Sequence, residues 1–433
     1  MFHPLSRFSR SRRRERRAEK RARVLTTFQR QLRDLGTVCK ALAAIAFVWT
    51  LISFVTYVGH DNGDTTSERV ATWARNHHLG KVIDWVETKE FSTPPSKTPA
   101  SKLFLVVPQA NLAGAATAKP SISPTAFQPA VVPAGNTAPA PVVVSGPAPL
   151  APLSIPALFS PALALEGQWS PIAKAGGQDT MWATSLRPLP DAGAVVATVV
   201  EIDQTHLRAG LFNGAEEPGG TWNRGNRIPT ELQPSLLAAM NGGFRFEHIK
   251  GGYKTEGIEV KPLKQGDATL AVGTDGHIAL GALGREIRDD GSWISLRQNL
   301  ILIVDDGKSQ VGKGIREGVW WGADYGNKVY VPRSAACVMK DGRIAYVLVG
   351  KVEATQLARA LINVGCVTAI QLDINGKWPV FFTFGPDGAG SLTGRFVDQR
   401  MGGDPNRYLT GSTKEFFAFF DATRLPAKSV LDH

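Results

Sequence analysis

The chain has 433 residues, of which 20% are charged, and a formal net charge of +11. The basic excess lies at the N-terminus. The first forty residues carry 13 Lys or Arg and three acidic residues, which leaves 36 basic and 35 acidic residues for the rest. A nearly balanced remainder argues against nucleic acid as the partner of the main body of the chain.

Residues 38–58 are apolar, and residues 41–58 carry no charged side chain. A helix of roughly 20 such residues can cross a bilayer. The Arg-rich residues 1–37 precede it, so the positive-inside rule predicts a cytoplasmic N-terminus. The sequence therefore predicts a single-pass protein of the cell (inner) membrane that contacts the lipid bilayer through residues 38–58 and has an extracytoplasmic C-terminal domain. A cleaved signal peptide is the alternative, but its apolar region is usually shorter, and no small-x-small cleavage site follows Val58.

The basic tail, residues 1–37, has two interpretations. A basic cluster beside a membrane span is typical of a segment that sets topology and contacts anionic lipid. Binding of nucleic acid or of another partner is the alternative. The position next to the span favours the first.

Two segments separate the span from the folded part. Residues 59–91 have apolar residues at loosely helical spacing, which predicts a juxtamembrane helical region. Residues 92–165 contain 15 of the 28 prolines and only three charged residues, all Lys. Because proline removes backbone donors and stiffens the chain, this Pro/Ala-rich stretch is expected to be an extended linker.

From residue 166 to residue 433 the sequence is typical of one globular domain. Residues 268–283 and 334–350 each place an Asp-Gly turn between apolar arms, which predicts two hairpins. A helix is expected over about 354–364, with Gly365 as its stop, followed by a buried strand over 366–373 that ends in an acid. The predicted fold class is α+β, with mixed or antiparallel sheets and a few helices.

Cys337 and Cys366 lie in apolar strands of the same predicted sheet, in the part of the chain expected outside the cytoplasm. Disulfides persist in such compartments. A Cys337–Cys366 bond is therefore one expectation, and two buried free thiols are the other.

Four clusters could carry chemistry. Three of them have polar or charged side chains near glycines, which allow close backbone approach, and the fourth is Arg333, whose planar guanidinium suits bidentate contact with a phosphate or carboxylate. An ordinary solvated loop is the alternative for each. The candidate residues in these clusters are Asn241, Gly242, Gly243 and Glu256; Arg333; Asp373 and Asn375; and Arg400, Asn406 and Arg407.

Several familiar sites are absent from the sequence. It contains no Cys/His spacing typical of zinc, no Gly-x-Ser-x-Gly nucleophile elbow and no Gly-x-x-x-x-Gly-Lys-Ser/Thr phosphate loop. No cofactor and no metal site are predicted, and a requirement for a divalent cation stays open.

Taken together, residues from about 166 to 420 resemble the phosphodiester glycosidase domain family, which includes the enzyme that uncovers mannose 6-phosphate. Asn241-Gly242-Gly243-Phe244 is similar to an Asn-x-Gly-Phe-Phe motif of that family, and Pro332-Arg333-Ser334 to the start of one of its strands. Leu372-Asp373-Ile374-Asn375 stands where the family has Leu-Asp-Gly-Gly-Gly, and it resembles a bacterial branch that also has stretches like 166–169, 216–220, 297–300 and 406–408.

The resemblance implies hydrolysis of a sugar-phosphate diester, here of a cell-envelope glycan or glycoconjugate. It implies catalytic roles for Asp373, Glu256 and Arg333. It also implies substrate binding by a larger group: Asn241, Gly242, Gly243, Arg297, Asn375, Arg400, Asn406 and Arg407. The alternatives are a non-catalytic module of the same fold that binds anionic glycans, and a scaffold whose function lies in the tail and the span.

Overall fold

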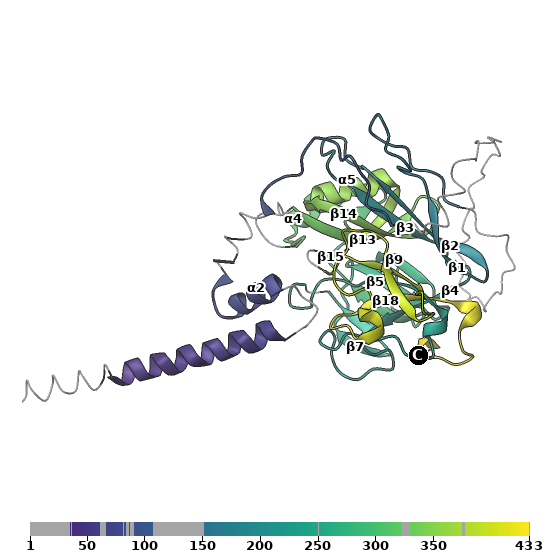
Figure 1. Ribbon diagram of the computed structural model, residues 1–433. Helices are drawn as coiled ribbons and strands as arrows, with labels where there is room; N and C mark the ends of the chain where they lie inside the picture. Colours follow the sequence, from purple (N-terminus) through teal and green to yellow (C-terminus); the bar gives the residue numbers. More distant parts are fainter. Residues whose placement is uncertain are drawn as a thin grey trace, which may run out of the picture.

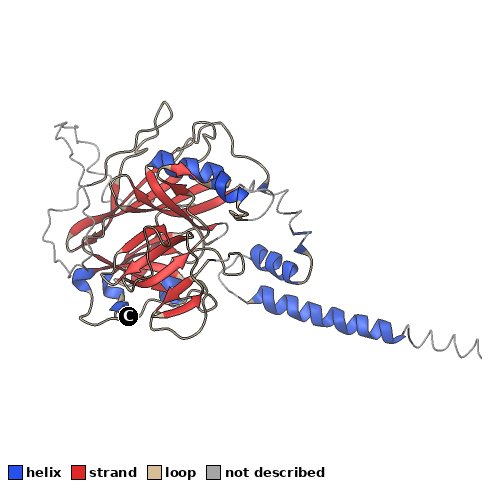
Figure 2. Cartoon of the chain, turned by 180° about the vertical axis from the view of Figure 1, so that it is seen from behind, coloured by secondary structure: helices blue, strands red, loops and turns tan. Residues whose placement is uncertain are grey.

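A computed structural model describes residues 35, 37–60, 66–80, 82, 83, 86, 91–106, 151–249, 251–322, 330–374 and 377–432 (Figure 1). Its main body is a β-rich domain, and a long helix extends from one side of it (Figure 2). The tail over residues 1–34 lies outside the described residues.

The long helix runs over Thr37–Gly59, with a mean hydropathy of 2.1 in its most apolar window. It is long and apolar enough to span a membrane, as the sequence predicts. Helix α2 (Thr66–Asn76) packs beside its C-terminal end. The Trp73 ring meets Phe54 edge-on at 4.9 Å, and its Nε1 donates to Ser53 Oγ at 3.1 Å.

The largest sheet has eight strands in the order β1-β2-β3-β14-β13-β15-β11-β12, and all its neighbouring strands are antiparallel. Its strands are β1 (Ser170–Ala175), β2 (Gln178–Leu186), β3 (Ala197–Ile202), β11 (Val304–Asp305), β12 (Lys308–Ser309), β13 (Val331–Met339), β14 (Ile344–Val352) and β15 (Cys366–Ile374).

Two five-stranded antiparallel sheets complete the domain, in the orders β7-β6-β10-β8-β9 and β17-β16-β5-β18-β4. Their strands are β4 (Leu207–Phe212), β5 (Leu236–Asn241), β6 (Tyr253–Thr255), β7 (Ile258–Lys261), β8 (Ala268–Gly273), β9 (Ile278–Ala282), β10 (Trp293–Gln298), β16 (Phe381–Pro386), β17 (Leu392–Phe396) and β18 (Phe416–Asp421). The helices of the domain are α4 (Val311–Arg316), α5 (Ala354–Val364), α6 (Arg407–Thr410) and the 3-10 helices Gln233–Ser235, Ala422–Arg424 and Val430–Asp432.

The eight-stranded sheet is covered on both faces. On β13, Ala335 and Cys337 belong to the apolar cluster shared with α5, whereas Ala336 belongs to the cluster shared with the five-stranded sheets. A strand buried on both faces reads as a continuous apolar run rather than as an alternation. This explains the apolar runs over residues 335–339 of β13 and 344–349 of β14.

The local predictions in this region are confirmed. The hairpins are β8–β9 and β13–β14, and Gly276 and Gly342 in their turns have φ of +82° and +89°. Helix α5 begins at a capping box of Glu353 and Gln356 and ends at Gly365 with φ +107°, a left-handed C-cap. The Cys337–Cys366 disulfide joins β13 to β15, which confirms the expected bond and not the alternative of two free thiols.

Fewer helices are present than an α+β class implies. Among the described residues of the domain the sheets dominate, and α5 is its longest helix at 11 residues. The described fold is therefore more β-rich than expected, with antiparallel sheets as predicted.

Both ends of the expected linker pack on the domain. Before residue 107, Phe104 O accepts from Gln399 N at 2.9 Å, and Val106 N donates to Val397 O at 2.8 Å. After residue 150, the ring nitrogen of Trp169 donates to the Leu153 carbonyl oxygen at 2.9 Å. The central part, residues 107–150, lies outside the described residues, and the boundary at residue 166 stays a prediction.

A buried acid on β3 makes the stability of the domain pH-dependent. Glu201 is 2% exposed, and its Oε1 lies 3.4 Å from Arg343 Nη1. Burial and the nearby Asp341 carboxylate raise the pKa of Glu201 to about 8, against the attraction of Arg343. The folded state therefore keeps this proton over a pH range in which the unfolded state has lost it.

We expect Glu201→Gln to stabilise the domain, and to do so more strongly at high pH. A pKa raised in the folded state makes the native chain lose stability as pH rises from about 4.5 to about 8. The neutral amide removes this loss, which amounts to roughly 3–5 kcal/mol. Thermal unfolding at pH 5 and pH 8.5 should show a larger gain in Tm at pH 8.5. An equal gain at both values would contradict the assignment.

Candidate active site

The centre of the candidate site is Asp373, near the C-terminal end of β15. Its backbone N donates to Gly242 O at 3.2 Å, and its carbonyl accepts from Ser334 Oγ at 2.7 Å. Asn241, at the end of β5, donates from Nδ2 to the same Ser334 Oγ at 3.1 Å. The motifs that contain Asn241 and Asp373 therefore meet. The motif Pro332-Arg333-Ser334, at the start of β13, contributes Ser334.

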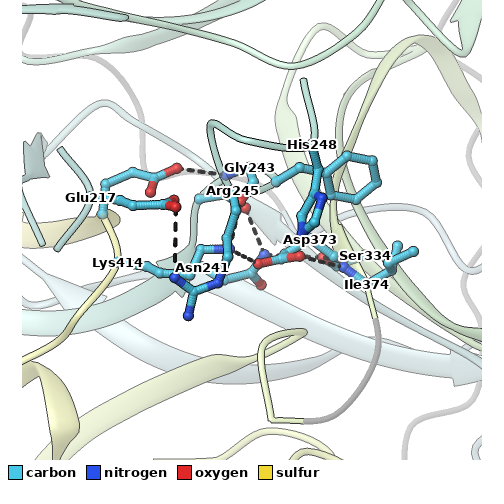
Figure 3. Close-up of polar contacts among 12 residues, drawn as sticks. Glu217, Asn241, Gly243, Arg245, His248, Ser334, Asp373, Ile374 and Lys414 are labelled. Atoms are coloured by element: carbon cyan, nitrogen blue, oxygen red, sulfur yellow. Dashed lines mark hydrogen bonds and ion pairs between the residues drawn. The ribbon is translucent and has the colours of Figure 1, made fainter. Parts of the chain in front are cut away.

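Asp373 forms an ion pair with Lys414, whose Nζ donates to Asp373 Oδ2 and to Gly243 O, the latter at 3.1 Å (Figure 3). Both side chains are at least nine-tenths buried. Burial raises the pKa of Asp373, while the Lys414 ammonium and the Ile374 N–H oppose the rise. The direction of this pKa shift is set by desolvation of the buried carboxylate, which the sequence alone does not show.

The loop after β5 is held by a buried pair formed by Arg297 and Glu415. Arg297 Nε donates to Glu415 Oε1 at 2.7 Å, and its Nη2 donates to Phe244 O at 2.6 Å. Glu415 Oε1 also accepts from Gly243 N at 2.9 Å. A Cβ on Gly242 would lie 2.5 Å from Glu415 Oε1, so only glycine fits there. Arg297 therefore supports the loop instead of being presented for substrate binding.

Three cationic groups surround Trp378, which is 6% exposed. The distances from its ring centroid are 4.7 Å to Lys414 Nζ, 5.4 Å to Arg407 Cζ and 5.8 Å to Arg245 Cζ. Arg407 is also fixed by donation to Lys377 O at 2.7 Å. This concentration of positive charge beside Asp373 suits a phosphate group.

A second carboxyl group, Glu217, lies beside these cations. Its Oε1 is 3.6 Å from Arg245 Nη1, and its buried Oε2 has no hydrogen-bond partner among the described residues. Burial raises the pKa of Glu217 to about 7; Lys414 and Arg245 lower it, and Glu415 raises it further. A carboxyl group that keeps its proton near neutral pH can act as a general acid. Figure 3 shows it on the opposite side of Arg245 from Asp373.

Sequence reasoning missed Glu217 and Lys414. Glu217 lies in the 216–220 stretch that was noticed only as a mark of the bacterial branch, and its two adjacent acids were a usable signal. Lys414 stands next to Glu415 just before the aromatic strand β18, and no local pattern distinguishes it from a surface lysine.

Several of the predicted residues lie elsewhere or have structural contacts. Glu256 accepts from the backbone N of Asn223 at 2.9 Å and of Arg224 at 2.8 Å, and none of its described hydrogen bonds reaches Asp373. Arg400 binds Asp398, with 2.6 Å between its Nη2 and Oδ2.

Asn406 and Arg333 are held by backbone groups. Asn406 Oδ1 accepts from Gly394 N at 2.7 Å. The Arg333 guanidinium is fully buried and donates to the carbonyls of Val352 and Trp321. Burial lowers its pKa to about 10. Asn375 lies outside the described residues.

Asn241 ties the site together without pointing its polar atoms to solvent. Its Oδ1 accepts from Val380 N at 3.0 Å and from Tyr346 Oη at 3.2 Å. Among the described residues, no group of three or more His, Cys, Asp or Glu side chains could hold a metal ion. The described site offers carboxylates, cations and backbone groups for chemistry.

Solved structures resemble the chain only distantly. The chain resembles the catalytic domain of zebrafish N-acetylglucosamine-1-phosphodiester alpha-N-acetylglucosaminidase, auto-inhibited by its pro-peptide, at 16% identity and a TM-score of 0.37, over 59% of this chain and 86% of that one. It resembles a hypothetical protein from Synechocystis at 12% identity and a TM-score of 0.37, over 58% and 64%. No curated protein matches the chain.

A family model gives the more specific result. The model described as phosphodiester glycosidase matches residues 235–373. The matched segment begins just before β5 and ends at Asp373, so it contains both strands whose ends meet in the site. Residues 235–373, about a third of the chain, are thus similar to the phosphodiester glycosidase family.

Proposed function

We propose that the chain is a membrane-anchored hydrolase that cleaves a sugar-phosphate diester of a cell-envelope glycan or glycoconjugate outside the cytoplasm. One observation carries the proposal. Glu217, whose pKa is raised to about 7, lies with the Arg245 and Lys414 cations and the buried Asp373. The family match over 235–373 adds the reaction class.

The reaction breaks the bond between the anomeric carbon and the bridging phosphate oxygen. Water adds its oxygen to the sugar, and the other product is a phosphomonoester. Glu217, protonated near neutral pH, donates its proton to the departing oxygen. Arg245 and Lys414 stabilise the negative charge of the leaving phosphate. Asp373 stabilises the positive charge that develops at the anomeric carbon and orients the attacking water.

The test is sugar release by the full chain in detergent micelles. UDP-N-acetylglucosamine and phosphoglycans from bacterial envelopes are the probes, and free sugar is the product measured. Binding of the phosphoglycans without any release of sugar would favour the alternative, a non-catalytic glycan-binding module. Neither binding nor release would favour a scaffold.

The proposed orientation has a separate test. The helix Thr37–Gly59 is preceded by the basic tail, which favours a cytoplasmic N-terminus. A reporter that is active only outside the cytoplasm, fused after His433, should therefore be active. A cytoplasm-specific reporter at the same position is the control, and activity of that fusion instead would reverse the orientation.

A further inference from the structure

The domain touches the residue that follows the apolar helix. His60 comes directly after Gly59, the last residue of that helix, and its Nε2 lies 3.6 Å from Glu216 Oε1. If the helix spans the bilayer, the loop that holds Glu216 lies at the bilayer surface. Figure 1 shows the helix ending close to the domain.

That loop also belongs to the candidate site. Glu216 Oε2 lies 3.5 Å from Arg245 Nη1, and the next residue is Glu217, the proposed acid. The Arg245 guanidinium thus contacts both Glu216, which meets the residue after the helix, and Glu217, the proposed acid. The site therefore lies at the bilayer-facing side of the domain.

A second contact with the site comes from the segment after α4. Gly322 packs against the end of β15: a Cβ added there would lie 2.3 Å from Ile374 Cδ1 and 3.4 Å from Phe244 Cζ. Two residues earlier, Trp320 is 63% exposed, and Ile315 on α4 is 48% exposed. Ile315 and Trp320 are thus exposed within a few residues of the contact between Gly322 and Ile374.

The composition of this segment suits a membrane surface. Lys313 and Arg316 on α4 are exposed beside Ile315 and Trp320. Tryptophan is enriched where one part of the ring is in apolar surroundings and the other is wet, and basic side chains are attracted to anionic lipid headgroups. Helix α4 lies on the same side of the domain as α2 and the long helix (Figure 1). The exposed side chains therefore lie where the bilayer is expected.

We propose that the substrate is a membrane lipid: a sugar 1-phosphate whose phosphate is esterified to a lipid alcohol held in the same bilayer. The lipid chain stays in the membrane between His60 and Trp320, and the sugar-phosphate head enters the site. Water adds its hydroxyl to the anomeric carbon, and the lipid phosphomonoester leaves with the remaining proton. This inference rests on the proposed function and specifies its substrate class.

The test uses the full chain reconstituted in vesicles of phosphatidylethanolamine and phosphatidylglycerol. Two probes have the same head, N-acetylglucosamine 1-phosphate, as its methyl ester and as its hexadecyl ester. The expected kcat/KM is at least about tenfold higher for the hexadecyl ester than for the methyl ester, because the apolar chain holds that probe in the bilayer. The double variant I315S/W320S should lose at least threefold on the hexadecyl ester and keep the rate on the methyl ester.

Ile258→Ser is the matched control. Ile258 is 55% exposed on β7, a different element from those that carry Ile315 and Trp320, and this variant should cleave both esters at the original rates. Because the methyl ester reports the chemistry alone, a folding defect in any variant would lower both rates.

The outcomes separate the two proposals. Cleavage of both esters at similar rates, or a hexadecyl rate that I315S/W320S leaves unchanged, would overturn the lipid substrate and keep the hydrolase. Cleavage of neither ester would count against the proposed function, and the lipid substrate would fail with it. Cleavage of the hexadecyl ester alone would support both.

Discussion

Glu217→Gln is expected to lower kcat for sugar release by about 10²- to 10³-fold, the range for loss of a general acid. The pKa of Glu217 is about 7, so in the wild-type chain the acid is protonated below pH 7 and loses its proton above it. Activity should therefore fall as pH rises through about 7. The glutamine side chain has no acidic proton to donate. The fall in activity near pH 7, one limb of the pH profile, should therefore be absent from the variant.

The fold should tolerate this change. Burial already favours the neutral form of Glu217, and an amide of the same shape is neutral at every pH. Glu216→Gln is the matched control, since it makes the same carboxyl-to-amide change at the neighbouring half-exposed residue. We expect it to cost less than about tenfold in kcat and to keep the limb near pH 7. A Glu217→Gln enzyme that retains full activity, or a limb that persists in it, would assign the acid role elsewhere.

Asp373→Asn is expected to reduce kcat by about 10³-fold or more, because it removes the negative charge beside the anomeric carbon. It also leaves the Lys414 ammonium buried without its counter-charge. Breaking a buried ion pair in this way should lower the free energy of unfolding by about 3 kcal/mol. Chemical denaturation and an activity assay measure the two effects separately.

The double variant D373N/K414M distinguishes loss of chemistry from loss of structure. Met replaces the ammonium with an apolar group of similar length, so most of the lost stability should return while activity stays low. Recovery of activity in the double variant would mean that Asp373 has only a structural role. Asp267→Asn is the control outside the site: burial also raises the pKa of this carboxyl, to about 6, and its loss should leave sugar release unchanged.

The sequence predicted the elements whose signals are local. The Asp-Gly turns and the glycine after α5 each require a left-handed residue at a known place, and the structure has one at each of them. The strand predicted over 366–373 from its apolar run is β15, which ends one residue later at Ile374. These signals lie within a few residues of what they predict.

The partners of Asp373 were not predictable in the same way. Arg333 lies on β13 opposite Ile374 of β15, and its guanidinium is held by two carbonyls. The cation that pairs with Asp373 is Lys414, 41 residues further along. Glu217 comes from a loop before the family segment. Which of many charged side chains become buried together is decided by the packing of three sheets. The pKa shifts follow from that burial.

The stretch between residues 106 and 151 begins and ends on the same folded body. Val106 is bonded to Val397 and Leu153 to Trp169, so the described residues on either side of this stretch both contact the domain. Its length therefore does not determine how far the catalytic groups stand from the lipid. In the proposed membrane orientation, that distance is set earlier in the chain, where His60 contacts Glu216. Shortening or extending residues 107–150 should thus leave the position of the domain above the bilayer unchanged, which makes this stretch the natural place for an inserted tag or partner domain.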